Sequence, residues 1–297
     1  MVFLVIGVMN CVASSLFAGG WANKEDNIKW LKQQTQSHNT GQKKLAGKVA
    51  IITGGASGIG EETACLFAQH GAGMVVIADI QDDLGNLVAA SIASHRCSYV
   101  RCDVTEEVQV KNLVDSTVNA HGQLDIMFSN AGILSSSDQT ILDLNLSEYD
   151  RLLAVNARGM AACVKHAARA IVERRVRGSI VCTASVSASH GGLWRTDYVM
   201  SKHAVKGLVR AASAQLGVHG VRVNCVSPSG LATPLTRGAH AAMETHELQK
   251  QYAQSSWLKG IVLTPKHIAD AVLFLACGDL EFVTGHDLVV DGCFHGA

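Results

Sequence analysis

The sequence predicts an α/β fold, a doubly wound seven-stranded parallel sheet in a single domain. From Lys48 onward, short apolar runs alternate with longer segments of helical periodicity, and this alternation indicates βαβ units. The composition agrees, because 48% of the 297 residues are hydrophobic and only 17% are charged. Strands buried on both faces account for much of so apolar a chain.

Seven runs rich in Val, Ile and other apolar residues are expected to form the strands, since each is short and ends at a polar residue. In chain order they are 49–53, 74–79, 98–103, 124–130, 178–185, 221–227 and 286–291. The segments between them carry apolar residues at helical spacing. The expected helices lie near 59–70, 82–94, 106–121, 147–174, 198–218 and 265–277.

Residues 1–45 precede this pattern and are predicted to be an N-terminal extension of a domain that spans 46–297. Residues 1–23 contain no charged residue, whereas 24–45 are polar and typical of a linker. The apolar part is short for a membrane span, which needs about 20 apolar residues, and it lacks the basic start of a secretory signal. We therefore expect a cytoplasmic protein. The alternative is that residues 1–23 target it to the endoplasmic reticulum or elsewhere.

Charge and cysteine usage exclude several classes of protein. Lys and Arg number 25, as do Asp and Glu, so the net charge is zero. This argues against a nucleic-acid-binding protein and a polybasic membrane-surface protein. The nine cysteines are odd in number and form no CxxC pair, which favours reduced, buried thiols. No Cys or His cluster has zinc spacing, so no metal site is expected.

A glycine-rich loop, TGGASGIG, follows the first strand and leads into the first helix. Glycine permits a tight turn and close approach of the backbone to a pyrophosphate, and the helix N-terminus attracts the anion. No Lys-Ser or Lys-Thr pair follows the loop, which excludes a P-loop. The loop predicts a dinucleotide site at Gly54, Ser57, Gly58, Ile59 and Gly60.

Asp79 ends the second strand, 19 residues after Gly60. An acidic residue at about this distance hydrogen-bonds the ribose 2′-hydroxyl of NAD, and its charge would repel the 2′-phosphate of NADP. Neither Ser57 nor Ile80 is a cation that would attract that phosphate. NAD is therefore the predicted cofactor, with contacts at Asp79 and Ile80. A solvated carboxylate at a strand end is the alternative interpretation of Asp79.

Four further motifs follow the loop. Tyr198 and Lys202 form a YxxxK pair, Ser185 lies 13 residues before Tyr198, Asn130-Ala131-Gly132 ends the fourth strand, and Asn156 stands in LAVNARG. Together with the loop, they resemble the short-chain dehydrogenase/reductase family, with its Rossmann-type fold, over residues 46–292. Strings such as SNAGIL and RVNCVSPSGLATPL resemble a plant subgroup in particular. That subgroup contains borneol and other terpenoid-alcohol dehydrogenases, secoisolariciresinol dehydrogenase and nepetalactol-related enzymes.

Tyr198 and Lys202 are four residues apart and share one helix face. A nearby ammonium lowers the pKa of a tyrosine from about 10, so Tyr198 is expected to act as general base on an alcohol. Ser185 would hold the substrate oxygen. Lys202 would also bond the nicotinamide ribose, and the resemblance implies that Asn156 holds a water for proton relay.

The resemblance implies further cofactor contacts and an oligomer. Asp103 and Val104 would flank the adenine. Asn130, Ala131 and Gly132 would line the adenosine side, and Pro228, Leu231 and Thr233 would meet the carboxamide. Long helices near 147–174 and 198–218 would form the contacts of a homodimer or homotetramer.

Three stretches beside Tyr198 are expected to determine the substrate: 133–140, 186–194 and a mobile segment, 235–258. They provide an apolar lining with few charges, which suits a hydrophobic secondary alcohol. The lining residues expected are Leu134, Leu193, Trp194, Leu235, Met243, Tyr252 and Trp257.

The predicted activity is the NAD-dependent oxidation of a hydrophobic, terpenoid alcohol or lactol to a ketone or lactone. Three alternatives are a reductase acting on a related carbonyl, an NAD-binding iridoid cyclase without redox chemistry, and a catalytically silent interaction protein. The intact Ser185, Tyr198 and Lys202 argue against the last two.

Overall fold

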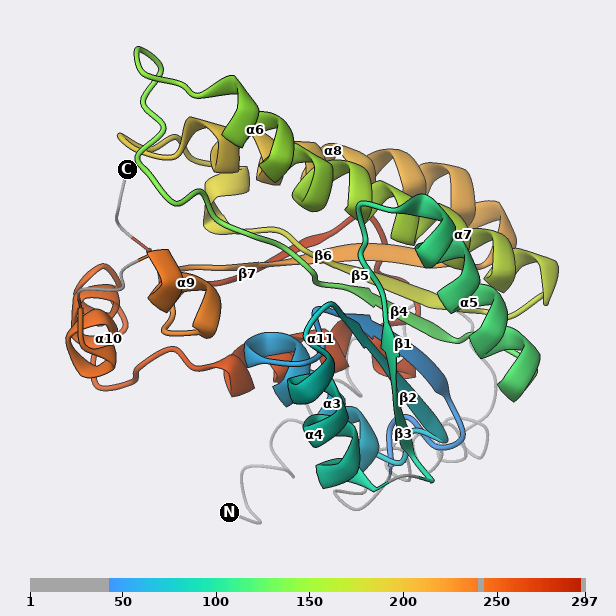
Figure 1. Ribbon diagram of the computed structural model, residues 1–297. Coiled ribbons are helices and arrows are strands. Elements are labelled where there is room, and N and C mark those ends of the chain that lie inside the picture. Colours follow the sequence, from blue (N-terminus) through green and yellow to red (C-terminus); the bar gives the residue numbers. More distant parts are fainter. Residues whose placement is uncertain (1–42, 94, 240–242, 295–297) are drawn as a thin grey trace, which may run out of the picture. The chain divides into compact units, whose positions relative to one another are not determined.

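The computed structural model describes residues 43–93, 95–239 and 243–294. Figure 1 shows these residues as one sheet with helices on both faces. The predictions made for residues 1–23 and for the linker up to residue 42 lie outside the described residues.

Seven parallel strands form one sheet in the order β3-β2-β1-β4-β5-β6-β7, which confirms the predicted fold class. The order reverses between β1 and β4, and ligands of such sheets bind outside the carboxyl ends of the strands at this point. The strands are β1 (Val49–Thr53), β2 (Met74–Asp79), β3 (Cys97–Arg101), β4 (Ile126–Ser129), β5 (Ser179–Thr183), β6 (Arg222–Pro228) and β7 (Asp287–Val290).

The sheet separates two hydrophobic cores. Successive side chains of a strand face opposite sides of the sheet, so Ile51 joins one buried cluster while Ala50 and Ile52 join the other. Because both faces are covered, the strand sequences are continuously apolar instead of alternating.

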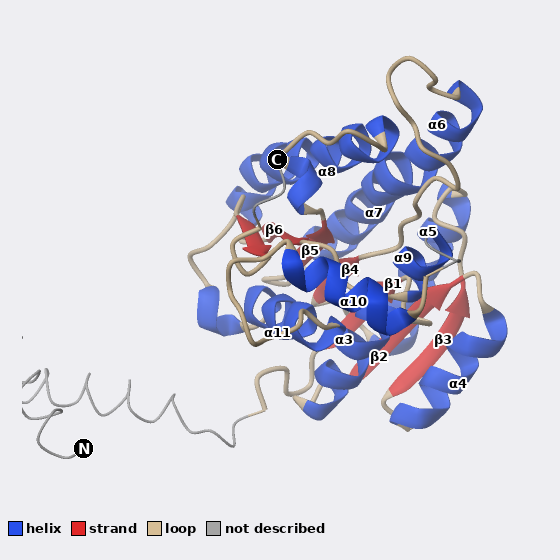
Figure 2. Ribbon diagram, turned by 90° about the vertical axis from the view of Figure 1, so that its left-hand side faces the viewer, coloured by secondary structure: helices blue, strands red, loops and turns tan. Residues whose placement is uncertain are grey.

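Helices form a layer on each face (Figures 1 and 2). Apolar residues of α5 (Glu107–His121), α7 (Met160–Glu173) and α8 (Thr196–Leu216) belong to the cluster of Ile51. Those of α3 (Gly58–Gln69), α4 (Asp82–Ile92) and α11 (Pro265–Ala276) belong to the opposite cluster. No described helix is both long and apolar enough to span a membrane.

Two regions differ from the sequence prediction. The helix expected over 147–174 is interrupted, since a π-helical turn, Ala154–Gly159, separates α6 (Leu146–Leu153) from α7. Apolar spacing continues on both sides of the turn, so the sequence does not reveal it. The segment expected to be mobile contains α9 (Pro234–Ala239) and α10 (Thr245–Gln254). In α10 only Leu248 is buried, so the helix lacks the apolar stripe by which a sequence identifies one.

Candidate active site

A cavity of about 940 Å³ lies at the carboxyl ends of the central strands. Its lining includes Gly54 after β1, Asp79 of β2, Asn130 after β4 and Thr183 of β5. These strand ends meet where the strand order reverses, the expected position for a ligand. Of the predicted cofactor contacts, all except Gly60 line the cavity: Gly54, Ser57, Gly58, Ile59, Asp79, Ile80, Asp103, Val104, Asn130, Ala131, Gly132, Tyr198, Lys202, Pro228, Leu231 and Thr233.

The glycine-rich loop is shaped by close backbone contacts. Gly54 has a φ of +65°, and a Cβ there would stand 2.9 Å from the Cα of Ala131. A Cβ on Gly60 would stand 2.1 Å from the carbonyl oxygen of Gly54. Gly60 itself is not part of the cavity lining. Gly60 lies beneath the loop and lets α3 pack against it.

Asp79 is held rigidly at the end of β2. Its Oδ2 accepts a hydrogen bond from the amide of Ala56 at 3.1 Å, and its Oδ1 accepts from the amides of Ile80 at 2.8 Å and Gln81 at 3.1 Å. The bond to Ala56 fastens the carboxylate to the glycine-rich loop. The negative charge is thus fixed at the edge of the cavity.

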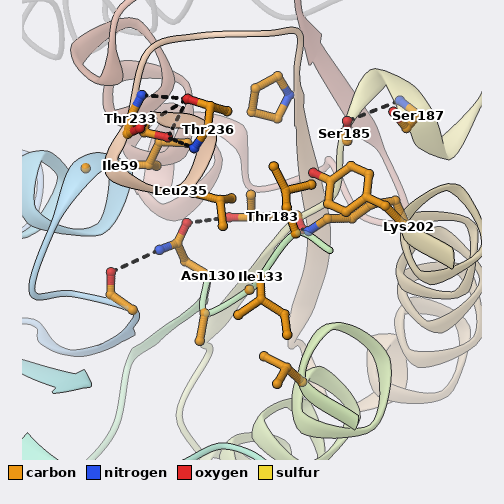
Figure 3. A pocket seen from close by; sticks show the side chains of 18 of the residues that line it. Ile59, Asn130, Ile133, Thr183, Ser185, Ser187, Lys202, Thr233, Leu235 and Thr236 are labelled. Carbon is orange, nitrogen blue, oxygen red and sulfur yellow. Dashed lines mark hydrogen bonds between the residues drawn. The ribbon is translucent and has the colours of Figure 1, made fainter. Parts of the chain in front are cut away.

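Asn130 fastens three strand ends together. Its Nδ2 donates to the carbonyl oxygens of Thr53 at 3.1 Å and Gly54 at 3.3 Å, and its Oδ1 accepts from the hydroxyl of Thr183 at 2.9 Å. Figure 3 shows the bond to Thr183 at the cavity. With these amide atoms engaged by the protein, Asn130 shapes the lining chiefly by positioning its neighbours.

Tyr198 and Lys202 lie one turn apart on α8, with the Nζ of Lys202 5.5 Å from the centre of the tyrosine ring. Nζ donates to the carbonyl oxygen of Thr183 at 2.8 Å, which holds the ammonium against the end of β5. Ser185 follows the same strand, and its hydroxyl accepts from the amide of Ser187 at 3.2 Å. Figure 3 shows Ser185 and Lys202 at the same part of the cavity.

Burial controls the acidity of this pair. It raises the pKa of Tyr198 to about 12, although a hydrogen bond with Ser185 and the charge of Arg195 oppose the change. It lowers the pKa of Lys202 to about 8. This rise is opposite in direction to the depression expected from Lys202. Desolvation of the phenolate outweighs the opposing effects, and these come from Ser185 and Arg195.

Asn156 lies behind the cavity lining in the π-helical turn and is completely buried. Its Oδ1 accepts from the amide of Ile133 at 2.8 Å, and its Nδ2 donates to the carbonyl oxygen of Ile133 at 3.0 Å. Nδ2 also donates to the hydroxyl of Ser201 at 3.2 Å. Asn156 therefore links the chain after β4 to the helix that carries Tyr198. π-Helical turns occur frequently at functional sites.

The residues expected on the substrate side lie partly at the cavity and partly outside its lining. Leu134, Trp194, Leu235 and Tyr252 line the cavity. Leu193 is not part of the lining and is 83% exposed. Met243 and Trp257 are also absent from the lining.

The sequence interpretation missed two features of this wall. Arg195 lines the cavity and brings a charge close to Tyr198, where few charges were expected. The ring of Tyr252 lies directly on Gly230, where a Cβ would stand 2.3 Å from its Cδ1. Neither belongs to a recognisable motif. A glycine opposite an aromatic ring is the one signal that could have suggested the contact. Gly230 and Tyr252 are too far apart in the sequence for that signal to be recognised.

Comparisons with known proteins agree with this geometry. Residues 54–295 match a family model described as enoyl-(acyl carrier protein) reductase. The (−)-isopiperitenol/(−)-carveol dehydrogenase, mitochondrial, of Mentha piperita is 58% identical over 251 residues, 84% of this chain and 94% of that protein. The (+)-cis,trans-nepetalactol synthase NEPS1 of Nepeta racemosa is 55% identical over 251 residues, 84% of this chain and 92% of that protein.

A solved structure leads to the same assignment. The crystal structure of a short-chain type dehydrogenase/reductase from Mycobacterium marinum has a TM-score of 0.76 and 34% identity, over 84% of this chain and 95% of that one. The strand order, the position of the cavity and the relatives agree. The chain belongs to the short-chain dehydrogenase/reductase family.

Proposed function

We propose that the protein oxidises a hydrophobic, terpenoid secondary alcohol or lactol to a ketone or lactone, with NAD as hydride acceptor. The observation that carries the proposal is that Ser185, Tyr198 and Lys202 line one cavity with Leu134 and Trp194. A few fixed polar groups beside an apolar wall suit a hydrophobic alcohol. A relative named as an isopiperitenol/carveol dehydrogenase supports the same class of substrate.

The cavity fits a nicotinamide dinucleotide. It runs past the N-terminal end of α3, where Gly58 has a φ of +59° and adds no side chain between Ser57 and Ile59. A Cβ on Gly132 would stand 3.3 Å from Oδ1 of Asn156 and 3.8 Å from Nζ of Lys202, so the glycine keeps a side chain out of the space beside Lys202. When bound, the nicotinamide would supply the hydride acceptor.

The choice of NAD over NADP rests on Asp79. Its carboxylate is fixed where the family places the adenosine ribose, and its charge would repel a 2′-phosphate. Arg101 reaches the same strand end, but its guanidinium bonds the carboxylate of Asp82 and the carbonyl oxygen of Ile80. Arg101 therefore already pairs with a carboxylate at this strand end.

The roles of the site residues follow from their positions. Tyr198 would take the hydroxyl proton of the alcohol as general base. Ser185 would hold the same oxygen by a hydrogen bond, keeping it beside the phenol. Lys202, anchored by Thr183, would orient the cofactor ribose and pass protons on, because its pKa of about 8 lies close to neutrality. Asn156 would hold the chain after β4 in place and would bind the water that completes this proton path.

A second candidate function is cyclisation of an iridoid precursor with NAD bound but not consumed. The 55% identity to a nepetalactol synthase is the observation that favours it. The reverse reaction, reduction of a related carbonyl, uses the same residues and is the third candidate.

A substrate panel separates these functions. The full chain is incubated with terpenoid alcohols, lactols, the matching carbonyls and a dialdehyde iridoid precursor, each with NAD(H) and NADP(H). We expect NADH formation from alcohols or lactols, with ketone or lactone as product. Cyclised product without any change in the cofactor would replace the dehydrogenase proposal with the cyclase. Activity confined to carbonyls and a reduced cofactor would replace it with the reductase.

We also propose that the protein works in the cytoplasm. The eight described cysteines are free and six are buried, which suits a reducing compartment. Targeting by residues 1–23 is the alternative, and the name of the Mentha piperita relative includes the word mitochondrial. Fluorescent fusions with and without residues 1–23 should both be diffuse. Organellar fluorescence that depends on these residues would contradict the proposal.

A further inference from the structure

Arg195 occupies an unusual position at the start of α8. It lies three residues before Tyr198 and has a left-handed backbone, with φ 65° and ψ 48°, although it is not glycine. Residues other than glycine rarely adopt this backbone conformation. Those that adopt it cluster at ligand-binding and active sites. Its neighbours must therefore hold it in place.

A buried polar network fixes the backbone around Arg195. The carboxylate of Asp197 is fully buried and accepts from the amide of Tyr198 at 2.7 Å and from the hydroxyl of Ser135. The carbonyl oxygen of Ser135 in turn accepts from Nη1 of Arg195 at 2.9 Å. The chain after β4 and the start of α8 are thereby joined, with the guanidinium at the end of the network.

The guanidinium has donors to spare. An arginine has five N–H groups, and among the residues that the structure describes its side chain makes one hydrogen bond, to Ser135. Within the described ranges, none of the ion pairs involves Arg195. A ligand oxygen that reached the remaining N–H groups would form charge-assisted hydrogen bonds with them.

Arg195 is close to the reacting end of the cavity. It lines the cavity beside Trp194 and Tyr198, and its charge opposes the rise that burial causes in the pKa of Tyr198 and of Tyr252. A substrate whose hydroxyl is bound at Tyr198 therefore shares one cavity with Arg195.

We propose that Arg195 binds a second oxygen atom of the substrate. The preferred substrate then carries an acceptor oxygen (carbonyl, ether or carboxylate) in addition to the hydroxyl that reacts at Tyr198. This inference rests on the proposed dehydrogenase function and narrows its substrate class from hydrophobic alcohols to oxygenated ones.

The test compares three ring alcohols of similar size: cyclohexanol, hydroxycyclohexanone and hydroxycyclohexanecarboxylate. For wild type, kcat/KM for at least one oxygenated compound should exceed that for cyclohexanol by about tenfold or more, because a charge-assisted hydrogen bond contributes roughly this much. Arg195→Met should bring that preference close to one, mainly by raising KM, and Arg195→Lys should retain part of it. Arg169→Met, an exposed arginine of α7 outside the cavity, is the matched control.

Each outcome either supports the Arg195 proposal or overturns it. Preference for the ketone identifies a neutral acceptor, and preference for the carboxylate alone identifies an anionic one; both support the proposal. No preference in wild type, or an equal loss of kcat on all three compounds in Arg195→Met, would overturn it. Calorimetric binding of the same compounds with NAD present gives the selectivity ratio even without turnover. Binding selectivity that depends on Arg195 without oxidation would count against the dehydrogenase function and leave the Arg195 site standing.

Discussion

At the scale of single residues, Lys202 couples the site to stability. Burial lowers its pKa from 10.5 to about 8 in the folded protein. Below about pH 8 both folded and unfolded chains carry the proton, and the buried charge costs about 3 kcal/mol. Above pH 8 the folded protein loses the proton while the unfolded chain keeps it up to about 10.5, so stability rises with pH.

A difference measurement isolates this effect from other titrating groups. Between about pH 7 and pH 9, wild type should gain about 1 kcal/mol of unfolding free energy relative to Lys202→Met. Urea unfolding of both cofactor-free proteins at each pH measures the gain. A difference that does not change with pH would show that Lys202 keeps an ordinary pKa.

Asp79 is expected to decide the cofactor. Asp79→Asn removes the charge that would repel a 2′-phosphate but keeps the side chain's shape and an oxygen for the Ala56 amide. The ratio of kcat/KM for NADP over NAD should rise by about tenfold or more, roughly the effect of 1.4 kcal/mol. Asp83→Asn, an exposed carboxylate of α4 outside the cavity, is the control. An unchanged ratio in Asp79→Asn would remove Asp79 from the cofactor assignment.

Most of the residues singled out by sequence motifs line the cavity, because the motif chemistry depends on spacings along one helix or at one strand end. Tyr198, Lys202 and Ser185 belong to this kind. Arg195 and Leu193 belong to no motif. Their positions relative to the cavity depend on contacts within loops, such as the hydrogen bond from Arg195 to Ser135. The direction of the pKa shift of Tyr198 could not be predicted from residue spacing either, because it depends on burial.

At the scale of elements, the end of α7 offers a stability test independent of function. Arg175 has a φ of 56° just after the helix. The amide of Arg175 donates to the carbonyl oxygen of Val172 and that of Val176 to Ile171, both at 3.0 Å. This is the Schellman arrangement, which favours glycine at the left-handed position.

Arg175→Gly should therefore raise the unfolding free energy by about 1 kcal/mol, since glycine adopts the left-handed conformation without strain. Arg174→Gly, one residue earlier, should lower it by a similar amount, because Arg174 keeps helical geometry with a φ of −84°. Denaturant midpoints of the three proteins provide the comparison. Destabilisation by both substitutions would show that Arg175 is not strained.

The existence of the strands was predictable, because buried strands of a parallel sheet have a simple apolar pattern. The π-helical turn at Ala154–Gly159 was not, since its neighbours keep helical spacing. The polar α10 was also hidden, although it brings Tyr252 onto Gly230 at the cavity. The missed elements therefore shape the substrate side, where specificity is decided.

At the scale of the whole molecule, the oligomer expected to form through the long helices near 147–174 and 198–218 stays a prediction. The net charge is zero, and large apolar side chains are exposed on α11 and β7, including Phe274 at 43% and Val289 at 47%. We expect a homodimer or homotetramer, whose interfaces would remove such groups from water. Light scattering during size-exclusion chromatography should give two or four times 31.4 kDa. A monomer at working concentrations would contradict this prediction.

The central claim is that Tyr198 removes the proton of an alcohol while NAD accepts the hydride. It is tested most directly by NADH absorbance with the best alcohol of the panel, for wild type and Tyr198→Phe. Loss of the phenol should lower kcat by roughly 100- to 10,000-fold, the usual contribution of a general base. NADH binding, followed by fluorescence, should survive the substitution. Turnover by Tyr198→Phe within a few-fold of wild type would contradict the account.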